Sequence, residues 1–89
     1  MHIKEFIFFL SSEKRFSAHT ITAYKNDLLQ FFSFLNQEDP SINDLKQISF
    51  KIIRKYVAFL LDSDLKSRTV NRKISTLRSY FKFLVRMDY

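Results

Sequence analysis

The sequence contains no cysteine and no glycine, and its only proline is Pro40. Without cysteine the chain can form neither a disulfide nor a thiolate metal site, which excludes disulfide-stapled secreted scaffolds and fits a reducing cytoplasm. Without glycine it cannot build a Gly-rich phosphate loop, or the glycine-flanked strained turn that carries the nucleophile of many hydrolases. With so few helix-breaking residues, the 89-residue chain is expected to form long helices joined by tight polar turns.

Metal ligands and membrane-spanning runs are scarce as well. The only histidines, His2 and His19, are far apart in the sequence, so a histidine-based metal site is not expected. The apolar run Ile3–Leu10 is too short to span a bilayer, and it lacks the basic start and the cleavage site of a signal peptide. We therefore expect no metal, no cofactor and no membrane partner, and we expect a cytoplasmic protein.

The chain nevertheless has the material for a core. Apolar residues make up 46% of the sequence, and 11 of them are phenylalanine. A length of 89 residues is at the small end of domains that fold alone. We therefore expect a single domain over residues 1–89.

Positive charge is concentrated in one stretch, residues 66–86. This stretch holds seven of the 15 Lys and Arg and none of the nine Asp and Glu, so it accounts for the whole formal net charge of +6. A basic surface of this kind is typical of a partner that is nucleic acid or another anionic surface.

The same stretch has the periodicity of an amphipathic helix. Its apolar residues recur at spacings of four and three, at Val70, Ile74, Leu77, Phe81 and Leu84. The basic residues fall on the opposite face, and Ser67 is expected to cap the first turn. A solvated charged face is the ordinary alternative, but solvated helices usually mix the two signs of charge. The one-signed face therefore favours contact with an anion.

Three further helices are expected from apolar stripes and capping residues. They are Ile3 to about Lys14, Ala18 to about Asn36 and Phe50 to about Leu61, with Ser17 and Ser49 as the caps of the last two. Short connections make sequential helices neighbours, so the expected fold is all-α, a small orthogonal bundle of four main helices.

The longest break is the segment 37–49. Asp39 and Pro40 indicate a turn, and the apolar residues Ile42, Leu45 and Ile48 are expected to tuck under the bundle. The segment has an acidic character, which places it away from a bound anion.

Two helices carry residues that have both a functional and a structural interpretation. His19, Thr20, Thr22 and Lys25 lie off the apolar stripe near the start of the second helix, where free N–H groups suit phosphate, although helix starts are often polar. On the first helix, Phe8 and Phe9 widen the apolar face. Packing against neighbouring helices is favoured over docking on another protomer.

Nothing in the sequence has the arrangement of a catalytic site. No carboxylate lies on a core face beside a second one, and Ser, His and Asp do not occur in the context of a nucleophile. Asp27 is expected to pair with a basic residue, of its own helix or of the fourth, in a structural role. We therefore expect this chain not to be an enzyme.

Two stretches carry a resemblance to a known family. One is Ser17-x-x-Thr20-x-x-x-Tyr24-Lys25-x-Asp27-Leu28-x-x-Phe31-x-x-Phe34-Leu35. The other is Thr69-Val70-Asn71-Arg72-Lys73-Ile74-Ser75-x-Leu77-Arg78-Ser79-x-Phe81-x-Phe83-Leu84. Together they resemble the N-terminal core-binding domain of tyrosine recombinases, the phage integrase and Xer-type family, over Ile3 to Arg86.

The resemblance implies a fold and a role. It implies a SAM-like bundle of four or five helices that forms half of a clamp around duplex DNA, with the second and fourth helices approaching the major groove. The catalytic Arg, His and nucleophilic Tyr would lie in a separate C-terminal domain. We therefore expect this chain to be part of a longer integrase and to lack strand cleavage. Its partners would be double-stranded DNA and other recombinase protomers, with no small-molecule substrate.

Carried over by position, the resemblance implies twelve DNA-contacting residues on the second and fourth helices. They are Ser17, His19, Thr20, Thr22, Lys25, Arg68, Thr69, Asn71, Arg72, Lys73, Thr76 and Arg78. Tyr24 is expected to be structural. The turn at 62–64 departs from the family by having no glycine, which bears on its geometry.

Two other functions remain as alternatives. A helical protein-interaction module that self-assembles through its Phe-rich first helix predicts self-association without DNA. A membrane-surface protein needs exposed apolar residues beside the charges. The apolar face of the basic helix is required for the core, so this alternative is not favoured.

Overall fold

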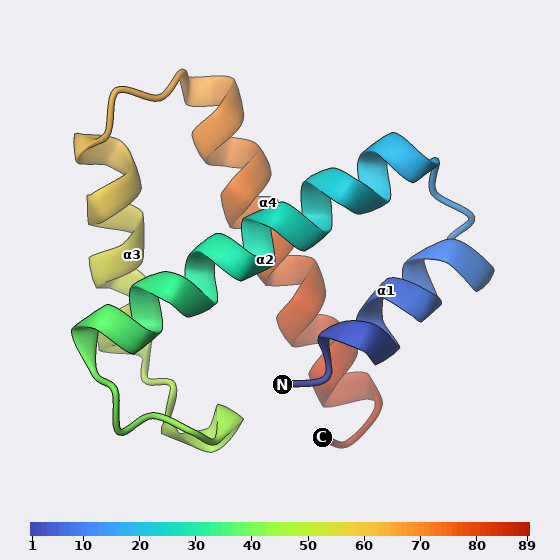
Figure 1. The fold of residues 1–89 in the computed structure, drawn as a ribbon, viewed down its shortest axis with the longest axis horizontal. Coiled ribbons are helices and arrows are strands. Elements are labelled where there is room, and N and C mark those ends of the chain that lie inside the picture. Colours follow the sequence, from blue (N-terminus) through green and yellow to red (C-terminus); the bar gives the residue numbers. More distant parts are fainter.

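The computed structural model describes residues 1–89 as four α-helices, one short 3₁₀ helix and no strands (Figure 1). The elements are α1 (Ile3–Ser12), α2 (Ala18–Glu38), η1 (Leu45–Gln47), α3 (Phe50–Asp62) and α4 (Ser67–Arg86). The expectation of an all-α bundle of four main helices is confirmed. None of the helices combines the length and the apolar composition that crossing a membrane requires.

The helices cross rather than run in parallel. In Figure 1, α2 passes across α4, α3 lies beside the first half of α4, and α1 lies towards its C-terminal end. The starts of α2 and α4 both lie on the upper side of this view, and the connection between α2 and α3 lies at the bottom. The molecule measures 33 × 30 × 16 Å, so the bundle is flat and its buried layer is close to both broad faces.

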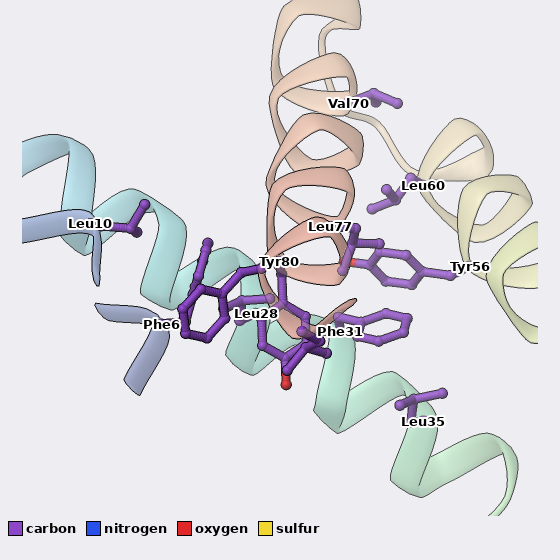
Figure 2. Packing of buried hydrophobic residues seen from close by; sticks show 12 residues of the cluster. Phe6, Leu10, Leu28, Phe31, Leu35, Tyr56, Leu60, Val70, Leu77 and Tyr80 are labelled. Atoms are coloured by element: carbon purple, nitrogen blue, oxygen red, sulfur yellow. The ribbon is translucent and has the colours of Figure 1, made fainter. Parts of the chain in front are cut away.

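The core is rich in aromatic side chains (Figure 2). Phe6, Phe31, Tyr56 and Tyr80 are completely buried. Phe6 meets Tyr80 edge-on at 5.4 Å between ring centroids, and Phe31 meets Tyr56 at 5.1 Å. Burying one such side chain stabilises a fold by about 1.5–3 kcal/mol relative to leaving it exposed. The first contact joins α1 to α4, and the second joins α2 to α3.

The expected caps hold for two helices and fail for the third. The hydroxyl of Ser17 accepts the backbone N–H of Thr20 at 3.2 Å, and the hydroxyl of Ser49 accepts that of Ile52 at 3.2 Å. Ser67 is not a cap, because it is the first helical residue of α4 and the cap position is Lys66. Since a lysine ammonium can only donate, the first turn of α4 has no side-chain acceptor for its free N–H groups.

The first helix ends two residues earlier than expected, at Ser12. The chain leaves it through Arg15, which has a left-handed φ of 54°, and the N–H of Phe16 then bonds to the carbonyl of Leu10 at 3.0 Å. This conformation favours glycine and costs another residue roughly 1 kcal/mol. A chain without glycine therefore makes this turn at some cost in stability.

The two aromatic residues that widen α1 have different surroundings. Phe9 packs against Phe83 of α4 with 5.0 Å between ring centroids, as the packing interpretation requires. Phe8 is 71% exposed and points away from the bundle.

In the acidic segment, Ile42, Leu45 and Ile48 are half-buried against the core, which confirms their expected position.

The two ends of the chain lie side by side (Figure 1). The ring of His2 stacks on the ring of Tyr89 at 3.8 Å between centroids. The hydroxyl of Tyr80 donates to the carbonyl of Met1. The residues that precede α1 are therefore held against α4 and against the residue that ends the chain.

Candidate nucleic-acid interface

The basic face of α4 is exposed along its whole length. Four of the expected contact residues of this helix are exposed, namely Arg68, Asn71, Arg72 and Arg78. A fifth, Thr69, is half-buried. Lys66, Lys82 and Arg86 extend the same positive surface. Acidic residues are absent from α4, so no carboxylate of its own offsets this charge.

A buried carboxylate lies where α2 crosses α4. Asp27 is 2% exposed, and its two oxygens accept from three residues of α4. Arg72 donates from Nε to Oδ2 at 3.2 Å and from Nη2 to Oδ1 at 2.9 Å. Lys73 donates to Oδ1 at 3.0 Å, and the hydroxyl of Thr76 donates to Oδ2 at 2.9 Å. Of the two pairings left open for Asp27, the one with the fourth helix is present.

These contacts decide the protonation of Asp27. Burial by itself raises the pKa of a carboxyl group, because it disfavours the charged form. The hydrogen bonds from Arg72, Lys73 and Thr76 outweigh burial and hold the pKa of Asp27 below its ordinary value. At neutral pH the site is therefore one carboxylate between two cations, with a net charge of +1.

Three of the expected DNA contacts, Arg72, Lys73 and Thr76, are part of this network, and the last two are turned inward. Thr76 is completely buried, so its side chain has no surface to offer to DNA and we remove it from the contact surface. The side chain of Lys73 is only 11% exposed, and its ammonium group also donates to Gln30 of α2. Lys73 therefore joins α2 to α4, and its charge is directed inward.

Gln30 was not expected at this site. It lies three residues after Asp27, so both project from the same side of α2. In the sequence, the three-residue spacing of these two hydrogen-bond acceptors was the signal that could have indicated a role for Gln30.

The start of α2 presents its polar residues in two directions. Ser17, His19 and Thr20 are exposed at the first turn, where the hydroxyls of Ser17 and Thr20 lie 3.0 Å apart. Thr22 and Lys25 are also exposed, but at about 100° per residue they project roughly 140° and 160° around the helix from Asp27. The first turn thus lies closer than Thr22 and Lys25 to the side of α2 that meets α4.

Arg78 lies beside a groove between α3 and α4. The groove has a volume of about 680 Å³, and apolar side chains such as Phe50, Ile53 and Phe81 line it. Arg78 projects about 120° around α4 from Arg72, again at about 100° per residue. Arg78 is therefore farther around α4 from Arg72 than from Arg68, from which it projects about 80°.

The chemistry of this surface is donation to anions. Exposed arginines, lysines and the open N–H groups of two helix starts donate hydrogen bonds and carry positive charge or partial charge. No group of three or more His, Cys, Asp or Glu is placed to hold a metal ion.

Comparison with known proteins gives one family and several relatives. The family model for the N-terminal SAM-like domain of phage integrases matches residues 3–88. The tyrosine recombinase XerC of Staphylococcus carnosus is 42% identical over 85 residues, which is 96% of this chain and 28% of that protein. XerC of Listeria innocua is 43% identical over 83 residues, 93% of this chain and 27% of the relative.

A third relative, XerC of Staphylococcus aureus, is 40% identical over 88 residues, 98% of this chain and 28% of the relative. The chain thus spans little more than a quarter of the length of these curated relatives. No solved structure matches it significantly.

Proposed function

This chain belongs to the family of phage integrase N-terminal SAM-like domains, and from that membership we propose that it binds duplex DNA as one half of a recombinase clamp. Its relatives are tyrosine recombinases, so the protein in which it acts would be a site-specific recombinase or integrase. Strand cleavage would belong to a separate catalytic domain, and other recombinase protomers would be the protein partners. A DNA-acting protein of this kind would work in the cytoplasm.

The observation that carries this proposal is the exposed, one-signed face of α4. Arg68 and its neighbours lie on a helix about 30 Å long, which is enough to follow a groove of DNA over several phosphates. Asp27 joins α2 to this helix where the two cross, and Figure 1 shows the starts of α2 and α4 on the same side of the molecule. The connection between α2 and α3, which belongs to the acidic segment 37–49, lies at the opposite side of the molecule.

Duplex binding should depend steeply on salt. Each neutralised phosphate contributes about −0.9 to the slope of log affinity against log salt concentration. About five phosphate contacts would give a slope of about −4.5, with a dissociation constant of about 10⁻⁴–10⁻⁶ M for unrelated sequence at physiological salt. Fluorescence anisotropy of a labelled 30-base-pair duplex across a salt series measures both quantities. Absence of binding at low salt would reject the proposal.

Self-association through α1 is a second candidate function, and the exposure of Phe8 favours it. Phe8 borders a hollow of about 440 Å³ between α1 and the end of α4, where a second copy has room to pack. Burial of a phenylalanine is worth about 1.5–3 kcal/mol, so Phe8→Ser should weaken a dimer roughly 10- to 100-fold. Phe50→Ser, at a similarly exposed residue of α3, is the matched control. Sedimentation velocity without DNA tests this candidate function. A wild-type chain that stays monomeric over a 100-fold range of protein concentration would contradict it.

A further inference from the structure

We propose that Arg72 reads a guanine in the major groove and that Asp27 is the positioning residue that holds it ready to do so. This inference rests on the proposed function, since it requires α4 to face DNA. Arg72 would then be the fixed reader of base identity, whereas exposed basic residues such as Arg68 would be mobile contacts to phosphate.

The geometry of the Asp27–Arg72 pair leaves the useful edge of the guanidinium free. A guanidinium group has five N–H donors in one plane. Asp27 takes one from Nε and one from Nη2, which is a side-on, two-point contact. Three donors remain, and both terminal nitrogens keep at least one on the outer edge. The side chain of Arg72 is 46% exposed, so that edge can reach solvent.

Guanine is the base that matches this free edge. In the major groove it presents two acceptors, O6 and N7, and arginine bound to both is the commonest specific contact with a base. Adenine presents one acceptor and one donor there, so a group that only donates is left with a clash of donors. An arginine that is already immobilised also loses less side-chain entropy when it binds.

The carboxylate that positions Arg72 is itself immobile. Thr76 and Lys73 donate to Asp27 from the same helix, and the carboxylate is buried between α2 and α4. The direction of the guanidinium is therefore set by the crossing of two helices and not by the rotamer of an exposed side chain.

Charge separates this residue from its neighbours. The carboxylate of Asp27 offsets the positive charge of Arg72 at about 3 Å, which weakens its general attraction for phosphate but leaves its donors directional. Arg68 is exposed and forms no ion pair, because Asp27 and Glu5 are the only acids paired in the structure. Arg68 thus has the mobility and the full charge that suit a phosphate contact.

The test begins with selection of preferred sequences by the wild-type chain from duplexes containing 12 randomised base pairs. Anisotropy then measures affinity for the selected duplex, for its single-base-pair variants and for an unrelated duplex. Arg72→Ala should lose about 5- to 150-fold of discrimination at one G·C pair, with little change in the salt slope. Arg68→Ala should weaken all duplexes alike and reduce the magnitude of the slope by about 0.9.

Replacing that guanine by 7-deazaguanine, which lacks the N7 acceptor, should weaken the wild type but not Arg72→Ala. Asp27→Asn keeps an oxygen for Thr76 but removes the charge that holds Arg72. It should lose discrimination at the same base pair and bind the unrelated duplex more tightly, because one negative charge is gone. If Asp27 has only a structural role, Asp27→Asn should lose helicity by circular dichroism and should bind both the selected and the unrelated duplex more weakly.

The outcomes are distinct. If Arg72→Ala weakens every duplex equally and lowers the slope, Arg72 is a phosphate contact and the inference is overturned. If the wild type binds duplexes without sequence preference, the inference is overturned while DNA binding stands. If the wild type binds no duplex at low salt, the proposed function fails together with it.

Discussion

Asp27→Ala is expected to lower the free energy of unfolding by about 3–5 kcal/mol, the cost of removing one partner from a buried ion pair. Asp27 is the acceptor for Arg72, Lys73 and Thr76, and its loss leaves the ammonium of Lys73 and the hydroxyl of Thr76 buried without it. Chemical denaturation with urea, followed by circular dichroism, measures the change.

Two variants separate the network from general effects of substitution. Asp27→Asn keeps an oxygen acceptor and should lose less stability than Asp27→Ala. Asp64→Ala, at an exposed acid in the turn before α4, should change stability by less than about 0.5 kcal/mol. A loss below about 1 kcal/mol for Asp27→Ala would mean that the crossing of α2 and α4 is held by apolar packing alone.

The same network predicts how stability changes with pH. The pKa of Asp27 is lowered in the folded chain, so its contribution is complete above its unfolded pKa of about 3.9. That contribution is lost as the pH falls from about 4 through the folded pKa, because the carboxylate must then take up a proton. In Asp27→Asn the decline of stability below pH 4 should be correspondingly shallower.

Charge reversal at the start of α4 is expected to weaken duplex binding by 100-fold or more. On the proposed function, Lys66→Glu with Arg68→Glu would remove two hydrogen-bond donors to phosphates, each worth about 1.5–3 kcal/mol, and would add repulsion. Both residues are exposed and neither is part of the Asp27 network, so the fold should tolerate the change. Anisotropy with the same duplex at low salt is the measurement.

Equal charge reversal on another helix is the control. Lys51→Glu with Lys55→Glu, both exposed on α3, lowers the formal net charge of +6 by the same four units. It should weaken binding by less than about 10-fold if the DNA face is on α4. Equal losses for the two double variants would show that net charge, and not this face, drives binding.

The helices themselves were predictable from the sequence because their apolar residues follow a 3.6-residue period over long stretches. The boundaries were less so. The apolar period of α4 begins only at Val70, so it does not show whether Lys66 or Ser67 is the cap. The end of α1 depends on the left-handed turn at Arg15, and only glycine or asparagine would have marked such a position in the sequence.

The candidate site was only partly predictable, for a related reason. Periodicity and the family pattern place a residue on a helix, but they do not show what the neighbouring helix brings opposite it. Arg72, Lys73 and Thr76 differ in exposure because Asp27 lies at the crossing and draws two of them inward. Phe8 and Phe9 differ in the same way, since α4 meets α1 on the side of Phe9.

The adjacent ends of the chain have a topological consequence. Where His2 stacks on Tyr89, a short linker would close the chain into a ring without moving a helix. New ends could then be opened in the exposed turn at Pro40 and Ser41, far from the start of α4. We therefore expect the four helices to pack in the same way when they follow one another in a permuted order. On this view the architecture is defined by the crossing of α2 and α4 and not by the order of the helices along the chain.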